Sequence, residues 1–275
     1  MTLKNILLLT AMSILVSCQE NKKGGPDDGE QTAANTAPVS LTDVAGTEEF
    51  PDASLSLANA TATPAGDSVR IALSFDVQNY ELKSQTSDET SQLCSNSGDG
   101  QHIHFIHNNK PYVALYEPKH EFTVAKGTEH DVLCFLSRSY HLSLKNKNAS
   151  ILYRFKVDST GKLEKLPEPT TPMVFYSRPK GDYVGKDTEN ILFDFYLWNT
   201  TLGSQNQLRM DISTGGKDTT MMITEWKPYF LKNLAMGKNS ITLTLLDASG
   251  AQVSGPETTV TREFNLSQGE PLSKQ

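Results

Sequence analysis

One set of β-strand signals recurs in the two halves of this chain, and that repeat restricts the fold more than any other feature. SFDVQNYEL aligns with DFYLWNTTL at an offset of 120 residues, which pairs Phe75 with Phe195 and Asn79 with Asn199. Further along, KGTEHDVLCFL matches MGKNSITLTLL, and each half closes on Arg, Phe and an aliphatic residue, in YRFKV and in TREFNL. Three matches in the same order predict two copies of one β-domain.

The pattern within each copy predicts strands and no helices. Short apolar runs are separated by turn residues, and helical periodicity over ten or more residues is absent after the N-terminal signal. Such spacing is typical of β-sandwiches. We therefore expect an all-β fold with two tandem immunoglobulin-like antiparallel β-sandwiches, at residues 50–160 and 173–268, joined by a Pro-rich linker at 161–172 and followed by a tail at 269–275. A single large sandwich or barrel is the alternative.

The matched KGTEHDVLCFL and MGKNSITLTLL segments also predict which side chains fill each core. Alternate residues of a strand share one face of the sheet. We therefore expect Leu133 and Phe135 to point into the first sandwich, and Leu243 and Leu245 to point into the second.

The N-terminus carries an export signal. MTLKNILLLTAMSILVSC has one early lysine, an apolar run too short to span a bilayer, and a small residue before Cys18. LVSC resembles the bacterial lipobox, which implies a signal peptide over 1–17 and a diacylglycerol, with acyl chains such as palmitate, on Cys18. Several chains on one residue anchor a protein stably to a membrane. A signal peptide cleaved elsewhere is the alternative.

Residues 18–49 predict a disordered tether, because they are rich in Gly, Pro, Asp, Glu and Thr and poor in large apolar side chains. Glu20 and the acidic DDGE resemble the signals that follow the lipidated cysteine in some Bacteroidota lipoproteins of the outer surface. We therefore expect an outer-membrane lipoprotein of the bacterial cell envelope, with the periplasmic and the surface face both open.

The net charge limits the binding partners that we expect for this protein, and the two remaining cysteines predict a disulfide. The formal net charge is −7, and no cluster of Lys and Arg offers a footprint for nucleic acid, so the expected partners are the membrane, through the lipid, and an envelope protein or small ligand. In an exported protein Cys94 and Cys134 predict a disulfide, with two free thiols as the alternative.

All six histidines lie in the first copy, within GQHIHFIHNNKPYVALY and the residues that follow. His102 and His104 alternate in a predicted strand and so share a face, where two imidazoles can bind one ion. We expect His130 to be the third ligand, ahead of His120 and His141, for Zn or Cu with an open fourth position. A polar ligand face without metal, or structural histidines, are the alternatives. The second copy has QLRMDIS at this place, so the scaffold itself does not require histidines.

FLSRSYHLSLK resembles the S-R-x-H phosphothreonine motif of forkhead-associated domains, which implies an anion site at Ser137, Arg138 and His141, although one extra residue separates the last two. The lipobox together with GQHIHFI, NNKPYVALY, FLSRSYHLSLK and MVFYSRPKGDY resembles a family of Bacteroidota envelope lipoproteins with immunoglobulin-like domains, some of which carry a phosphopeptide-binding label. That resemblance implies a location and an architecture but no activity.

No G-x-S-x-G elbow or flanked acid pair accompanies these motifs. The sequence therefore favours a lipid-anchored binding module whose first domain presents a histidine-lined face to a ligand or divalent metal. The alternatives are a metal-dependent enzyme that uses His102, His104 and His130 with a bound water, and a structural or assembly lipoprotein.

Overall fold

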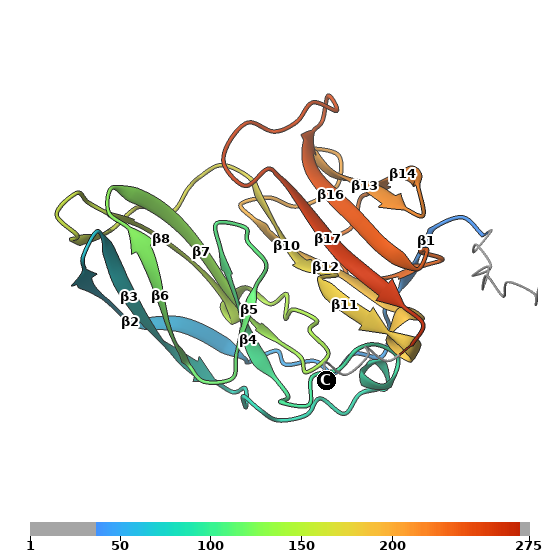
Figure 1. Ribbon diagram of the computed structural model, residues 1–275, viewed down its shortest axis with the longest axis horizontal. Coiled ribbons are helices and arrows are strands. Elements are labelled where there is room, and N and C mark those ends of the chain that lie inside the picture. The colour runs from blue at the N-terminus through green and yellow to red at the C-terminus, as the bar shows by residue number, and fades with distance from the viewer. Residues whose placement is uncertain (1–36, 270–275) are drawn as a thin grey trace, which may run out of the picture. The chain divides into compact units, whose positions relative to one another are not determined.

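The computed structural model describes residues 37–269, and in that range the regular structure is 17 strands and three single-turn 3₁₀ helices (Figure 1). The short helices are η1 (Glu89–Gln92), η2 (Lys147–Ala149) and η3 (Gly185–Thr188). The expected all-β fold is confirmed. No helix among the described residues is long and apolar enough to cross a membrane. The signal peptide expected at 1–17, Cys18 and much of the tether lie outside the described residues.

The first sandwich packs a three-stranded sheet on a five-stranded one around a shared apolar core. The smaller sheet has the order β2 (Ser54–Ala65), β3 (Ser68–Gln78), β6 (Lys119–Ala125). The larger sheet has the order β5 (Val113–Leu115), β4 (His102–His107), β7 (Thr128–Ser137), β8 (Ser150–Val157), β9 (Leu163–Lys165).

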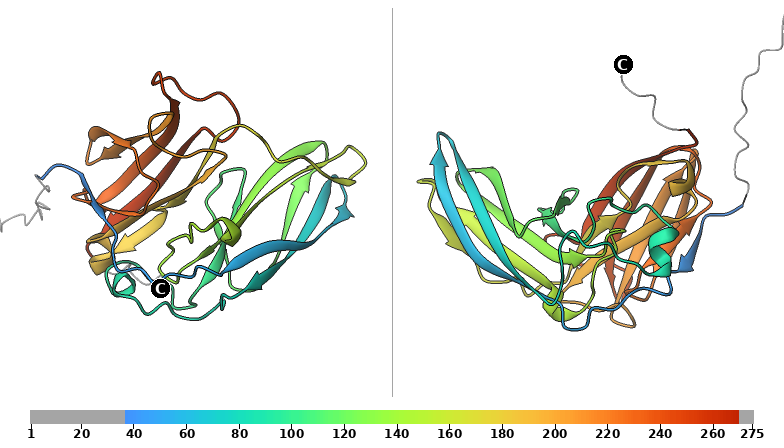
Figure 2. Two further views of the ribbon diagram at one scale, coloured as in Figure 1. Left: turned by 180° about the vertical axis from the view of Figure 1, so that it is seen from behind. Right: turned by 90° about the horizontal axis from the view of Figure 1, so that it is seen from below.

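The second sandwich repeats this arrangement around its own core with the yellow-to-red strands, to which the blue strand β1 is added at one edge (Figure 2). One sheet has the order β1 (Ser40–Asp43), β15 (Tyr229–Lys232), β12 (Ile191–Trp198), β10 (Met173–Arg178). The other has the order β11 (Gly181–Val184), β17 (Thr259–Ser267), β16 (Gly237–Asp247), β13 (Asn206–Thr214), β14 (Lys217–Ile223). All pairings are antiparallel except that of β11 with β17.

Both sandwiches have the strand order of immunoglobulin-like domains, with equivalent strands at β3 and β12, β4 and β13, β7 and β16, and β8 and β17. The three internal sequence matches fall on these strands. Asn79 and Asn199 end equivalent strands, adopt φ of 53° and 54°, and donate their side-chain amides to the carbonyls of Asp52 and Pro169. The repeat predicted from the sequence is thus present in the order of the strands. The match of KGTEHDVLCFL with MGKNSITLTLL is one residue out of register, because Leu133 faces outward whereas Leu243 faces the second core.

Two expected boundaries are wrong. Residues 40–43, assigned to the tether, form β1, because Leu41 packs on the second core while the strand pairs with β15. Residues 163–165, assigned to the linker, form β9 and pair with β8.

The expected disulfide is also absent, since Cys94 and Cys134 are both free thiols. Cys134 lies in the core of the first sandwich. Cys94 instead packs on a separate small cluster with Tyr140 and Leu192. Their side chains face different apolar regions, and Cys134 is buried whereas Cys94 is partly exposed.

The larger sheet of the first sandwich is covered on its outer face as well. Leu133 and Phe135 of β7 are fully buried, but they pack against Met173, Phe175 and Tyr196 from β10 and β12 of the second sandwich. The expectation that Leu133 and Phe135 fill the first core is therefore wrong. Val132, Cys134 and Leu136 fill that core instead. Leu243 and Leu245 do lie in the second core, as expected.

Candidate metal centre

β4 presents His102 and His104 on the covered outer face of its sheet. Residues directly opposite each other in an antiparallel pair share a face, and His104 lies opposite Phe135 in the register of β4 with β7. Ile103 and Phe105 alternate with the two histidines and fill the core of the first sandwich. Neither histidine has exposed surface. The His-x-His pair therefore points toward β10 of the second sandwich.

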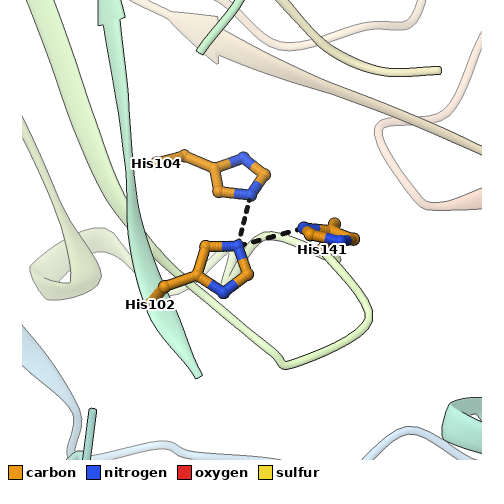
Figure 3. A group of neighbouring side chains, drawn as sticks. All are labelled: His102, His104 and His141. Carbon is orange, nitrogen blue, oxygen red and sulfur yellow. Dashed lines mark hydrogen bonds between the residues drawn. The ribbon is translucent and has the colours of Figure 1, made fainter. Parts of the chain in front are cut away.

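A third imidazole joins the pair from the turn that follows β7. His141 adopts φ of 71°, and its backbone N–H donates to the carbonyl of Arg138, which closes the turn. The Nε2 atoms of His102 and His104 are 3.0 Å apart, and His141 Nδ1 lies 3.1 Å from His102 Nε2 (Figure 3). One ring nitrogen from each of the three lies within 4.8 Å of the others.

Hydrogen bonds orient the imidazoles of His102 and His104 through their Nδ1 atoms, which point away from the other histidines. His102 Nδ1 lies 2.8 Å from the carbonyl oxygen of Gly100, which can only accept, so the Nδ1–H donates and Nε2 carries a lone pair. His104 Nδ1 lies 3.2 Å from Ser177 Oγ on β10, and in the metal-free chain His104 Nε2–H donates to the lone pair of His102 Nε2. When His104 instead donates from Nδ1 to Ser177, its Nε2 is free to bind a metal. Such outer partners orient metal-binding histidines in many proteins.

The nitrogen separations suit a metal ion. Tetrahedral zinc with Zn–N bonds of about 2.0–2.1 Å places its ligand nitrogens roughly 3.3 Å apart. The two contacts of 3.0 and 3.1 Å are close to that spacing. A small outward movement of the rings would create room for an ion between them.

Burial keeps the three imidazoles neutral, which is the form that binds metal. Desolvation lowers the pKa of His102 to about 4, and it lowers the pKa of His104 and His141 well below the usual value. The positive charges of Arg178 and Lys180 lower the pKa of all three histidines further.

His130, the expected third ligand, is not part of this cluster. It lies on the other face of β7, where its Nδ1 is 2.9 Å from His107 Nε2 and its ring packs on Phe155. His120 packs on Phe105 on that same side of the sheet. The expectation is wrong because even-numbered residues of β7 share the face of Cys134, whereas His104 lies opposite Phe135.

The expected anion site is also not assembled. Arg138 is 4% exposed, and its guanidinium donates to the main-chain carbonyls of Glu48 and Ser143. The hydroxyl of Ser137 donates to the carbonyls of Arg138 and Leu142. In this conformation the hydrogen bonds of Ser137 and Arg138 stabilise the turn that contains His141.

Sequence reasoning missed Ser177 and Tyr112. Tyr112 precedes β5, is 3% exposed and stacks on His104 with ring centroids 3.6 Å apart and planes inclined by 9°. Its hydroxyl lies 3.2 Å from His141 Nδ1. Tyr112 lies in NNKPYVALY and stacks on His104 from the turn between β4 and β5, whereas Ser177 lies in MVFYSRPKGDY and reaches His104 from the second sandwich. No spacing in either segment connects these residues to the histidines.

No family model and no curated protein matches this chain. Among solved structures, the fibronectin(III)-like modules of Clostridium thermocellum CbhA are 12% identical with a TM-score of 0.26, covering 78% of this chain and 95% of that one. The extracellular domain of a hybrid two-component system from B. thetaiotaomicron is 9% identical with a TM-score of 0.29, covering 72% of this chain and 31% of that one.

The two tandem V-type regions of the chitin binding protein VCBP3 are 9% identical with a TM-score of 0.23, covering 78% of this chain and 99% of that one. All three TM-scores lie below 0.5. The immunoglobulin-like architecture therefore rests on the strand order of the chain itself.

Proposed function

We propose that this protein binds a divalent transition-metal ion, zinc or copper, through His102, His104 and His141. The observation that carries the proposal is the arrangement of the β4 pair: two Nε2 atoms meet at 3.0 Å while both Nδ1 atoms are held from behind. Imidazole nitrogens are suitable ligands for both of these metals, and copper(II) binds a given site more tightly than zinc.

The proposed role is binding rather than catalysis. Two of the three ligands have no exposed surface, and Ser177, which orients His104, comes from the opposite sandwich. All three ligands belong to the first sandwich, and the second sandwich contacts the centre through Ser177. Metal binding is expected to stabilise the folded state by mass action.

We further propose that the protein is an outer-membrane lipoprotein of the bacterial cell envelope, anchored through acyl chains on Cys18. The support is the apolar run that ends in LVSC, together with the resemblance to envelope lipoproteins. Replacing the thiol in Cys18→Ser is expected to move the protein from the detergent phase to the aqueous phase on phase partitioning. A variant that remains in the detergent phase would contradict lipidation.

The metal proposal is tested with two matched variants. The full mature chain, purified without a histidine tag and freed of metal, is titrated with Zn²⁺ and with Cu²⁺, and bound metal is measured by elemental analysis after dialysis. We expect one ion per chain. His141→Ala should weaken binding by more than about tenfold, because even loss of an outer partner costs that much.

His130→Ala removes an imidazole from the opposite face of the same sheet and should leave the affinity unchanged. Equal loss in both variants, or no metal on the parent chain, would refute the assignment of the site.

A further inference from the structure

Tyr112 is the aromatic neighbour that lies closest to the three histidines. Its ring covers the imidazole of His104 in a nearly parallel stack, and its hydroxyl oxygen lies 3.2 Å from His141 Nδ1. Ligand atoms that share one tetrahedral ion with bonds of about 2.0–2.1 Å lie roughly 3.3 Å apart. The phenol oxygen thus already stands at a neighbouring-ligand distance from one nitrogen of the centre.

Two cations lie against the same ring. Lys180 Nζ is 3.8 Å from the ring centroid of Tyr112 and donates to the backbone carbonyl of that residue. The guanidinium of Arg178 is 5.4 Å from the same centroid, is 7% exposed, and donates to the hydroxyl of Tyr183 instead of to a carboxylate. Tyr112 therefore lies between the histidines and two positive side chains.

A metal ion at the three histidines would add further positive charge at this buried place. Three neutral imidazoles contribute none of the compensating negative charge, and uncompensated buried charge is costly. A carboxylate would serve, but the cluster of metal-binding side chains found among residues 37–269 holds only the three histidines. A phenolate at Tyr112 would supply the missing negative charge next to both cations.

We propose that Tyr112 is the fourth ligand of the centre and that it binds as a phenolate. The inference rests on the proposed metal site and adds an anionic oxygen to its three nitrogens. The step needs no oxidant: the O–H bond of Tyr112 breaks, the proton leaves to solvent, and the oxygen electron pair forms the bond to the metal. The ring moves toward the ion as this bond forms.

This ligand set suits both zinc and copper(II), whereas copper(I) prefers soft thiolate and thioether ligands. Copper(II) binds a given site of nitrogen and oxygen ligands more tightly than zinc. We therefore expect copper(II) to bind this centre most tightly.

The experiment is a titration of Cu²⁺ into the metal-free mature chain, followed by visible absorption and by equilibrium dialysis. Phenolate bound to copper(II) gives a charge-transfer band in the visible range, which should grow to one equivalent. Tyr112→Phe keeps the ring and loses the oxygen. It should abolish the band while copper still binds, with affinity lowered by about tenfold or more, as expected for a group that tunes a metal site.

Tyr116→Phe is the matched control. Tyr116 also packs near the centre, with its ring centroid 5.1 Å from that of His102, but its hydroxyl bonds Ser97. The control should keep both band and affinity. Resonance Raman spectra of the parent chain, excited in the band, should show phenolate vibrations and need no variant.

The outcomes separate the two proposals. Copper that binds without a band, or a band that survives Tyr112→Phe, overturns the Tyr112 ligand and leaves the three-histidine site in place. A parent chain that binds no copper overturns the Tyr112 ligand, and a parent chain that binds neither copper nor zinc overturns the three-histidine site as well.

Discussion

β7 and β16 occupy the same position in the two sandwiches, yet they are buried differently. β7 is buried at every residue from His130 to its end, whereas β16 begins with two exposed residues and then alternates between buried and partly exposed residues as far as Thr242. The cause lies outside each sandwich, because β10 and β12 cover the outer face of β7. Equivalent strands of one fold thus differ in burial, and the difference depends on whether another sheet covers the outer face of the strand.

The neighbouring strands β4 and β13 repeat the contrast. The register places His104 opposite Phe135 in the first copy and Arg209 opposite Thr244 in the second. Arg209 is partly exposed and pairs with Asp211, whereas His104 is fully buried. Covering an outer face has therefore turned a position that usually meets water into one that can hold a neutral, metal-binding side chain.

The largest expected effect tests this covered face directly. Leu133 lies on the outer side of β7, and Thr242 takes the equivalent outer position on β16, where its hydroxyl bonds Thr261. Leu133→Ala should lower the free energy of unfolding by about 2–5 kcal/mol, the range for buried leucines. Thr242→Ala should cost less than about 1 kcal/mol. Urea unfolding midpoints of the two variants measure the contrast, and similar values would show that the outer face of β7 is not packed in solution.

The second prediction uses pH. Burial lowers the pKa of His102 to about 4 from its usual 6.5, so the folded state binds fewer protons than the unfolded state between these values. Stability should therefore fall as pH falls through this window, by about 3 kcal/mol at about 1.4 kcal/mol per pH unit.

Gln207 precedes Arg209 by two residues on β13, as His102 precedes His104 on β4, so glutamine at position 102 offers a natural control. In metal-free protein, the free energy of unfolding of His102→Gln should lack this part of the pH dependence. Parallel pH profiles for parent and variant, from urea unfolding between pH 7 and pH 4, would contradict it.

The smallest expected change in the free energy of unfolding concerns Asn79 and Asn199, which have the same conformation and the same kind of hydrogen bond in the two copies. Asn79→Ala and Asn199→Ala each remove a side-chain hydrogen bond to a backbone carbonyl. Each also leaves alanine at a positive φ, which asparagine tolerates better. Each should cost about 1–2 kcal/mol. Thermal unfolding measures both. Replacement by glycine, which relieves the backbone, should recover part of the loss at each site, and unequal losses would show that the two corners are not equivalent.

The sequence predicts the fold well because the repeat marks equivalent strands in both copies. It also predicts that His102 and His104 share a face, since alternation alone decides this. It does not predict the third ligand, because VLCFL in β7 is apolar on both faces and periodicity cannot say which face is the core. The choice of His130 followed from that ambiguity, as did the inward assignment of Leu133. A shift of one residue in the assignment of a strand moves every side chain to the opposite face of the sheet.

Ser177 could not be predicted, since it reaches the centre only when the two sandwiches pack together. Tyr112 was missed because it lies in the turn between β4 and β5, outside the alternation of the strand, and strand periodicity does not say where a turn residue points. The free thiols of Cys94 and Cys134 have a similar explanation. Cysteine number and compartment suggest pairing, but the two side chains enter separate apolar clusters.

β1 sets an order of events during synthesis. Asp43 is partnered by Tyr229, 186 residues later in the chain, although the whole first sandwich lies between them. At about 5–20 residues per second, this strand waits roughly 10–40 s before its partner exists. During that time the first sandwich can close alone, while the second cannot complete its edge. The earliest strand to emerge is thus among the last to be paired, and cutting the chain between the halves would leave β15 as an open sheet edge.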